Sequence, residues 1–413
     1  MVHHKYFCIL MLLGGIPSAS AHGAQLWNQV GVIRNGVDGV TNFSGGYDAV
    51  ISNDGAYLYA AAYNSSSVSV FSRNATTGAL NQVQVLQNNV GGVVGIGATR
   101  AVRLSPDGQF VYAAGTANNA LAIFGRNSTT GQLTFLSQYT NGGPLNGLSG
   151  VNAMNISGNG KFVYASSETG NSLSTFARDS TTGGLTFVET IKDGVNSTNS
   201  LASIRSFTIS SDDRFLYAPA RDSNKVTQFD RNSTTGTLSV DQATFGGVNF
   251  NGPTHITFSP DVKHAYVASQ FSDSVSLFNV DSVSGNLTFV TTYRDNTGGF
   301  DYLNHAEDIA ITADGKYVMI TATLDNALTI CTRDPLTGAL TVLQEFRDGV
   351  AGIDGLFRPR ELTLSPDNRF LYVMSPEENA IAIFTIPEPS ALWLAGMGLA
   401  LLVAFGRRSR TRV

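Results

Sequence analysis

The chain contains a unit of about 52 residues that occurs seven times. Each unit contains a short polar turn, often Ser-Pro-Asp-Gly, and these turns end 53, 52, 53, 49, 53 and 53 residues apart. The turns occupy residues 52–55, 105–108, 157–160, 210–213, 259–262, 312–315 and 365–368. Tandem repeats of this length are typical of the blades of a β-propeller. The repeat therefore limits the possible architectures more than any other feature of the chain.

Each unit supplies four short segments that favour β-strands. In the second unit, a hydrophobic run at 102–104 precedes the polar turn, and an aromatic and aliphatic run at 110–113 follows it. A third run at 120–124 leads to a polar turn that ends at Gly131, and 133–135 begins a fourth. These runs are rich in strand-forming residues, and the repeats lack helical periodicity. We therefore predict an all-β fold, a seven-bladed β-propeller of four-stranded antiparallel blades.

The two ends of the repeat region complement each other. The seventh unit stops at 384–386 and lacks its outer strand, whereas residues 23–26 and 34–37 resemble 338–341 and 347–350. We predict that the N-terminal strand completes the last blade, which leaves no long open sheet edge. An open solenoid of the same repeats would not explain these complementary ends. The predicted propeller domain spans residues 22–386.

The N-terminal segment has the pattern of a secretory signal peptide. His3, His4 and Lys5 precede an apolar run from 6 to 16, and small residues at 19–21 provide a cleavage position. Residues 1–21 are therefore predicted to be removed on export.

The C-terminal segment has three parts in a fixed order. Pro387, Glu388 and Pro389 come first, an apolar run from 391 to 405 follows, and the chain ends in several arginines. This order resembles the PEP-CTERM sorting signal of Gram-negative bacteria. The resemblance implies that exosortase and the secretion machinery are partners. It also implies that residues 387–413 hold the exported protein transiently in the inner membrane until cleavage releases it to the cell surface or beyond. The apolar run is short beside the roughly 20 residues of a membrane-spanning helix, and a permanently anchored surface protein is the alternative.

Composition argues against two classes of protein. The formal net charge is -5 and only 14% of the residues are charged, without a stripe of Lys and Arg in the repeats, so nucleic acid is not an expected partner. Once the signal peptide is removed, Cys331 is the one remaining cysteine, so an intramolecular disulfide is excluded. Cys331 stands where other units have Phe, and we expect it in the core.

Charged residues gather where the first strand of each unit begins. Seven positions before the end of each turn the residues are Asp48, Ala101, Ala153, Ser206, His255, Asp308 and Glu361. One position earlier they are Tyr47, Arg100, Asn152, Arg205, Thr254, Glu307 and Arg360. Sevenfold geometry predicts that both rows surround one rim of the central channel, on the face opposite the polar turns. Such a rim is either a channel mouth that satisfies its own charges or a site that places an acid or base beside an anionic ligand.

The repeats resemble the seven-bladed lactonase family related to 6-phosphogluconolactonase. Units of that family have the form Gly-Pro-x-His, a hydrophobic strand and Ser-Pro-Asp-Gly, and residues 252–261 are the closest copy here, with His255 at the motif position. The resemblance extends from about residue 25 to 386 and implies hydrolysis of a sugar lactone or a similar ring. The candidate catalytic residues are His255, Glu307, Asp308 and Glu361, and the candidate ligand-binding residues are Arg100, Arg205 and Arg360. The chain departs from the family pattern because His255 is the one histidine in the two rows. His264 follows a polar turn and is expected to be exposed.

Two functional classes remain open. The first, favoured by the single rim histidine and by the sorting signal, is an exported binding protein of the cell envelope or extracellular matrix that contacts glycan or protein. The second is an exported lactonase-like hydrolase acting at the rim. No cofactor is expected, although Asp48, Asn152, Asp308 and Glu361 offer the oxygen ligands that calcium prefers. The enzyme requires His255 to lie close to a carboxylate, whereas the binding protein does not.

Overall fold

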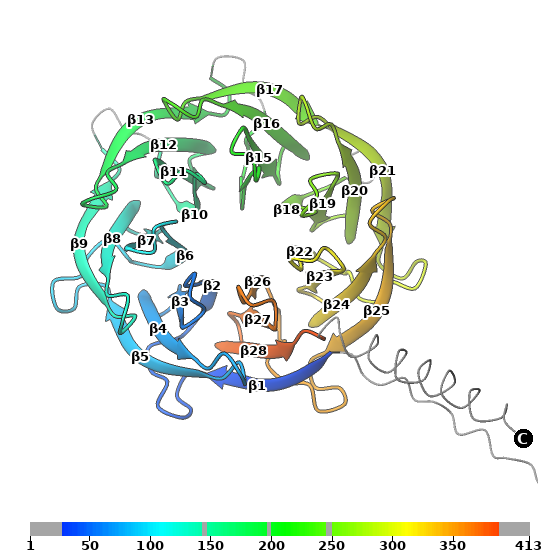
Figure 1. The fold of residues 1–413 in the computed structure, drawn as a ribbon, viewed down its shortest axis with the longest axis horizontal. Coiled ribbons are helices and arrows are strands. Elements are labelled where there is room, and N and C mark those ends of the chain that lie inside the picture. Colours follow the sequence, from blue (N-terminus) through cyan, green and yellow to red (C-terminus); the bar gives the residue numbers. More distant parts are fainter. Residues whose placement is uncertain (1–26, 143–146, 196–199, 245–249, 388–413) are drawn as a thin grey trace, which may run out of the picture.

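The structure is a computed structural model that describes residues 27–142, 147–195, 200–244 and 250–387. These residues form 28 strands in seven four-stranded sheets, and no helix occurs among them. The sheets stand in a ring around a central axis, and neighbouring strands within each sheet run antiparallel (Figure 1). The predicted seven-bladed, all-β propeller is confirmed.

Six blades are formed by consecutive strands. Blade 1 contains β2 (Gly46–Ile51), β3 (Tyr57–Ala62), β4 (Ser67–Arg73) and β5 (Leu80–Gln87). Blade 2 contains β6 (Thr99–Leu104), β7 (Phe110–Gly115), β8 (Ala120–Arg126) and β9 (Leu133–Thr140). Blade 3 contains β10 (Val151–Ile156), β11 (Phe162–Ser167), β12 (Ser172–Arg178) and β13 (Leu185–Lys192). Blade 4 contains β14 (Thr208–Ile209), β15 (Phe215–Ala220), β16 (Lys225–Arg231) and β17 (Leu238–Thr244). Blade 5 contains β18 (Pro253–Phe258), β19 (His264–Ser269), β20 (Ser274–Val280) and β21 (Leu287–Arg294). Blade 6 contains β22 (Ala306–Ile311), β23 (Tyr317–Ala322), β24 (Ala327–Arg333) and β25 (Leu340–Arg347).

Blade 7 combines both ends of the propeller. Its strands are β26 (Glu361–Leu364), β27 (Phe370–Ser375), β28 (Ala380–Thr385) and the N-terminal β1 (Asn28–Arg34). β1 lies antiparallel to β28, with Arg34 opposite Ala380 and Asn28 opposite Thr385. The prediction that the N-terminal strand closes the last blade is confirmed.

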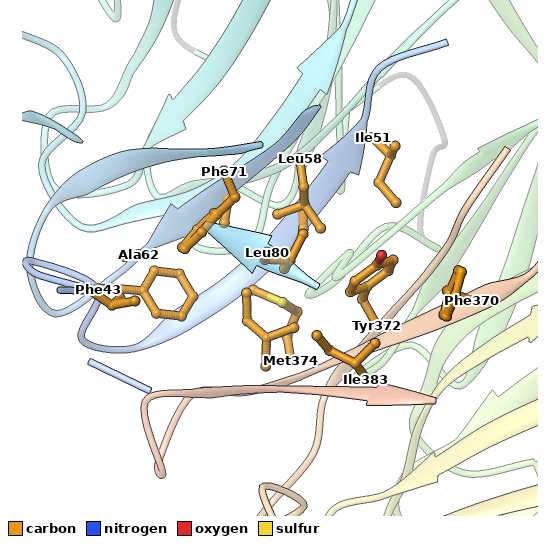
Figure 2. Packing of buried hydrophobic residues seen from close by; sticks show 14 residues of the cluster. Phe43, Ile51, Leu58, Ala62, Phe71, Leu80, Phe370, Tyr372, Met374 and Ile383 are labelled. Carbon is orange, nitrogen blue, oxygen red and sulfur yellow. The ribbon is translucent and has the colours of Figure 1, made fainter. Parts of the chain in front are cut away.

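Apolar side chains seal the joint between blades 7 and 1. Leu58 and Phe71 of blade 1 pack against Tyr372, Met374 and Ile383 of blade 7 in one buried cluster (Figure 2). Each of these five side chains is almost fully buried. The ring is therefore closed twice, by strand pairing within blade 7 and by hydrophobic packing between blades.

A buried arginine joins neighbouring blades at the polar turns. Arg178, the last residue of β12, donates from Nε to Tyr112 Oη at 2.9 Å and from Nη1 to the Gly160 carbonyl at 3.0 Å. Its third contact is Asp107, the aspartate of the Ser-Pro-Asp-Gly turn in the preceding blade. The equivalent arginines that bond a tyrosine of the preceding blade are Arg73, Arg126, Arg231 and Arg333. The repeated turn residues therefore join neighbouring blades rather than bind a ligand.

This joint should make a measurable contribution to stability. We expect Arg178→Leu to lower the free energy of unfolding by about 2–4 kcal/mol, because it removes a buried cation and leaves its partners unpaired. The Arg178 side chain is 1% exposed. Lys316→Ala is the control, because Lys316 is 54% exposed and lies 3.8 Å from Asp314, and such surface pairs contribute less than about 1 kcal/mol. Urea denaturation measures both changes, and equal effects of the two variants would contradict the prediction.

The environments predicted for Cys331 and His264 differ in outcome. Cys331 is buried in the core, as predicted, and burial raises the pKa of its thiol. The expectation that His264 is exposed is wrong. His264 begins β19 at the place where Phe110 begins β7, so it is buried, and its Nδ1 lies 2.8 Å from the Arg333 guanidinium. Burial and that positive charge lower the pKa of His264, which keeps the ring neutral at neutral pH.

Both predicted targeting segments fall outside the described residues. These are the signal peptide at 1–21 and the tail from Glu388 onward, with its apolar run at 391–405. Pro387 is described and follows β28 closely. The described part of the chain contains no helix that is long and apolar enough to cross a membrane.

Candidate functional site at the mouth of the channel

A polar cavity lies where the innermost strands begin. It is lined by all members of the two predicted rows, together with Arg103, Met154 and Phe207. The space that the centre of a water molecule can occupy is about 70 Å³. The cavity is therefore narrow, wide enough for a few waters or for one small polar group of a larger ligand.

A β-bulge explains why two consecutive residues of one strand face the same cavity. Side chains of a regular strand alternate between faces, so one member of each pair should turn away. The pairing register shifts at this point in five innermost strands, next to Asp48, Ala101, Ala153, His255 and Asp308. Bulges redirect side chains and are frequent beside functional sites. The strand ends therefore concentrate twice the expected number of side chains at the mouth.

A histidine and a carboxylate lie together on one side of the cavity. His255 Nδ1 in β18 is 2.8 Å from Asp308 Oδ1 in β22, although the ring nitrogen is not aligned for a hydrogen bond. Asp308 is fixed by two backbone groups, because its oxygens accept from the amides of Ile309 at 2.8 Å and Leu362 at 2.7 Å. Contacts of this kind often tighten only when substrate binds. The pair has the composition of a general base and the carboxylate that orients it.

The next blade adds a carboxyl group with an unusual pKa. Burial raises the pKa of Glu361 well above its ordinary value of 4.5, and the negative charges of Asp308 and Asp48 raise it further. Arg103 opposes this shift only in part, because its guanidinium is paired with Asp48. Burial raises the pKa of Asp48 as well, but Arg103 pairs directly with that carboxylate and opposes the shift. Glu361 is therefore the carboxyl of this cavity best suited to hold a proton.

The remaining wall of the cavity is formed by small, uncharged side chains of the row that contains His255. Blades 2, 3 and 4 contribute Ala101, Ala153 and Ser206. At the same repeat position, blades 5, 6, 7 and 1 contribute His255, Asp308, Glu361 and Asp48, in that order. A ligand group can therefore approach the acidic and basic side chains from the side of the alanines.

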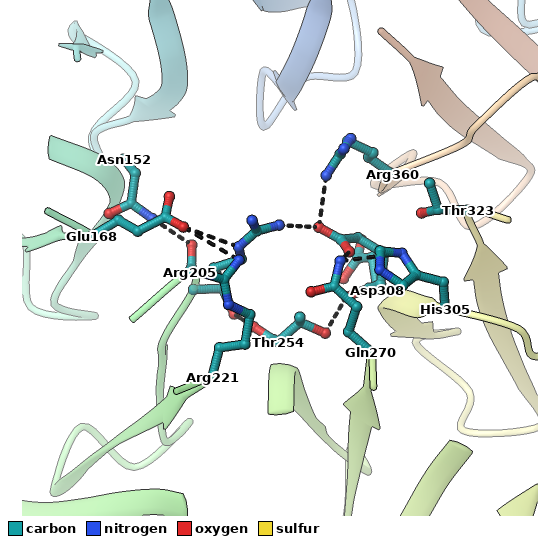
Figure 3. A network of polar contacts seen from close by, with 12 residues as sticks. Asn152, Glu168, Arg205, Arg221, Thr254, Gln270, His305, Asp308, Thr323 and Arg360 are labelled. Atoms are coloured by element: carbon teal, nitrogen blue, oxygen red, sulfur yellow. Dashed lines mark hydrogen bonds and ion pairs between the residues drawn. The ribbon is translucent and has the colours of Figure 1, made fainter. Parts of the chain in front are cut away.

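Above these residues the mouth is crossed by ion pairs (Figure 3). Arg205 bridges Glu168 at 3.2 Å and Glu307 at 3.0 Å. Arg360 shares the same Glu307 oxygen at 3.0 Å, and Arg100 pairs with Glu168 at 2.7 Å. Although burial opposes ionisation, the guanidinium groups around Glu168 lower the pKa of its carboxyl. The three predicted arginines are thus brought together, and each is already paired.

Several members of this network lie outside the two rows predicted from the sequence. Glu168, Arg221 and Gln270 come from the loops between the second and third strands, each at the first position after the second strand. Arg221 lies 3.5 Å from Glu168, and Gln270 Nε2 is 3.1 Å from His305 Nδ1 and 3.0 Å from Glu307. Burial lowers the pKa of His305, consistent with a ring nitrogen that accepts from Gln270. These loop residues share one repeat position, which is the signal that would have identified them.

Three of the four oxygen donors considered for calcium, Asp48, Asn152 and Asp308, have other partners. Asp48 accepts from the Val102 amide at 2.8 Å and from Arg103. Asn152 donates to two backbone carbonyls, and its side-chain oxygen accepts from Ser166 at 3.2 Å. Within the described residues, the group of acidic side chains close enough to share one ion is Asp348, Asp354 and Glu378, outside this cavity. Arg103 thus supplies a positive charge beside Asp48.

Comparison with protein families gives two matches. A model described as "Lactonase, 7-bladed beta-propeller" matches residues 40–145, 140–249 and 243–393. A model of the PEP-CTERM protein-sorting motif matches residues 385–410. The 6-phosphogluconolactonase of Enterobacter sp. (strain 638) is 25% identical over 339 residues, which cover 80% of this chain and 91% of that protein.

Solved structures share the fold with different chemistry. The periplasmic gluconolactonase of Pseudomonas aeruginosa is similar with a TM-score of 0.63 and 18% identity, over 80% of this chain and 96% of the other. The hydrazine synthase of Kuenenia stuttgartiensis is similar with a TM-score of 0.61 and 15% identity, over 85% and 98%. At these identities the likeness shows the fold alone, so any activity must be argued from the cavity.

Proposed function

Because the chain belongs to the seven-bladed β-propeller lactonase family, we propose that it hydrolyses a sugar lactone outside the cytoplasm. The observation that carries this proposal is the placement of His255 2.8 Å from Asp308, with Glu361 on the next blade. A binding protein has no need for a base, an orienting carboxylate and a proton donor on one wall of a narrow cavity.

In the proposed reaction His255 acts as the general base. Asp308 lies against Nδ1, so Nε2 is the nitrogen that takes a proton from water. The water oxygen forms a bond to the lactone carbonyl carbon, and the carbonyl oxygen becomes negatively charged. Arg103 faces the cavity and supplies the positive charge that stabilises this oxyanion.

Glu361 completes the ring opening. The bond between the carbonyl carbon and the ring oxygen breaks, and the ring oxygen takes the proton of Glu361, which gives an open hydroxy acid. Exchange with solvent then returns a proton to Glu361 and removes one from His255. A carboxyl with a raised pKa suits this role, because it keeps its proton at a higher pH than an ordinary glutamate does.

The mouth arginines suit substrate binding. Arg100, Arg205 and Arg360 each use part of the guanidinium for Glu168 or Glu307, and each has five N–H donors in total. The remaining donors would hold hydroxyl or carboxylate oxygens of the substrate, while Glu307 keeps two of the arginines in place. We assign Glu307 to positioning rather than to proton transfer.

The PEP-CTERM motif implies recognition by an exosortase and export by membrane-associated sorting. We propose in addition that residues 1–21 are a signal peptide and that the run at 391–405 anchors the chain transiently in the inner membrane. Cleavage near Pro387, Glu388 and Pro389 would then release it to the cell surface or beyond. An exported enzyme would meet unphosphorylated sugar lactones, because phosphorylated sugars are found in the cytoplasm.

A non-catalytic binding role is the second candidate. It is favoured by the ion pairs at the mouth, where Arg100, Arg205 and Arg360 are already matched by carboxylates. In that case the polar mouth would contact a glycan or protein of the envelope or matrix.

A hydrolysis assay of the purified protein separates the two. We expect turnover of unphosphorylated sugar lactones, measured by pH-stat titration of the acid formed. EDTA treatment should reduce this activity by less than about twofold, because Arg103 rather than a metal polarises the carbonyl. Turnover that EDTA abolishes and calcium restores would contradict this mechanism. Absence of turnover across aldonolactones of different ring size would favour the binding role.

A further inference from the structure

A second hollow adjoins the cavity between blades 7 and 1. It shares Tyr47, Arg100 and Arg360 with the cavity and extends outward to Tyr63, Asn64 and Glu377. The space that the centre of a water molecule can occupy here is about 270 Å³, which is several times that in the cavity. A ligand group too large for the cavity can therefore lie beside it and remain in contact with the same arginines.

Two tyrosine rings form the apolar part of this hollow. The rings of Tyr47 and Tyr63 are 6.2 Å apart and inclined at 46°. Arg100 and Arg360 lie over the Tyr47 ring at 4.8 and 5.4 Å, which fixes its orientation. Tyr63 is 38% exposed, so its ring is accessible. Such rings offer an apolar face with a polar edge.

Unused polar groups surround these rings. The Tyr63 hydroxyl, the Asn64 side-chain amide and the Glu377 carboxylate make no hydrogen bond to another residue of the described chain, although the charge of Glu377 acts on Arg360. Asn64 is held against Gly45, where a Cβ would lie 2.9 Å from the amide carbon, and Gly45 has a φ of 71°. The hollow thus combines apolar faces with free donors and acceptors at its edge.

This lining selects one class of ligand group. An alkyl chain would cover Asn64, Glu377 and the arginines without satisfying them. A second anionic group would meet the Glu377 carboxylate. A neutral pyranose ring has C–H faces for the tyrosines and hydroxyl groups for the amide, the carboxylate and the guanidinium groups.

We propose that the hollow binds the second sugar of a glycosylated lactone, so that the substrate is a disaccharide or longer aldonolactone rather than a free monosaccharide lactone. The lactone ring then meets His255, and the attached pyranose lies on Tyr63. This inference rests on the proposed lactonase function for its kinetic test but not for its binding test.

The kinetic test compares lactobionolactone with glucono-δ-lactone. We expect wild-type kcat/KM to favour the disaccharide lactone, and Tyr63→Ala to reduce this preference about tenfold. Phe271→Ala is the matched control, because Phe271 is an exposed aromatic residue, 51% accessible, in the equivalent loop of blade 5 outside the hollow. A preference that is absent, or equally affected by both variants, would overturn the proposal while leaving lactone hydrolysis intact.

The binding test uses methyl β-lactoside, which has no lactone. We expect its dissociation constant, measured by NMR titration, to rise about tenfold in Tyr63→Ala and to be unchanged in Phe271→Ala. If this holds and no lactone is hydrolysed, the sugar site stands and the proposed enzyme falls. If lactones are hydrolysed but methyl β-lactoside does not bind, the sugar site falls.

Discussion

Replacing His255 by Gln should lower kcat/KM for lactone hydrolysis about 10³-fold, the effect expected when a general base is lost. Gln retains a polar side chain of similar size but cannot take a proton from water. The loss should appear mainly in kcat, because His255 contacts the reacting water rather than the binding groups at the mouth. Steady-state kinetics at pH 7 measure it, and circular dichroism verifies that the propeller is intact.

His305→Gln provides the matched control for this experiment. His305 also lies near the mouth, but its Nδ1 is 3.1 Å from Gln270. It does not lie beside a carboxylate of the row that contains His255 and Asp308. We expect this variant to lose less than about tenfold in kcat/KM, since it only disturbs the support of Glu307. If His255→Gln retained more than a tenth of the wild-type rate, His255 would not be the base.

The ring architecture could be predicted from the sequence because it is repeated. A repeated turn, a repeated strand pattern and complementary ends each give the same answer, so one irregular unit does no harm. Blade 4 illustrates this, since β14 has only two residues and the blade is still complete. His264 shows the limit, because its environment depends on Arg333 from the next blade, and repeat alignment does not reveal such a partner.

The cavity was only partly predictable. Repeat position predicts which residues lie at the rim, and the bulges bring both rows to one cavity. The partners were not predictable in this way, because Arg205 reaches Glu307 two blades away, and no local pattern encodes that contact. Nor does residue type distinguish Glu361 from Glu307, since the raised pKa of Glu361 comes from burial and from carboxylates on neighbouring blades.

Glu361→Gln should reduce activity and raise stability together. Loss of the proton donor should lower kcat about 10²-fold. The folded state raises the pKa of Glu361, so it binds this proton more tightly than the unfolded chain does. Stability is therefore lost as the pH rises from the ordinary carboxyl pKa of 4.5 toward the raised value. Gln does not titrate, so the variant should become more stable than the wild type by about 1 kcal/mol or more at pH 8, with a smaller difference at pH 4.

Glu189→Gln distinguishes a catalytic carboxyl from one that is merely buried. Burial also raises the pKa of Glu189, and its carboxylate accepts from the Leu238 amide at 2.6 Å, away from the cavity. This variant should shift stability with pH in the same direction but leave kcat unchanged. Urea denaturation at pH 4 and pH 8, combined with the lactone assay, measures both properties. Glu361 would lose its assigned role if its Gln variant became more stable at pH 8 and kept full activity, because its raised pKa would then be a consequence of packing alone.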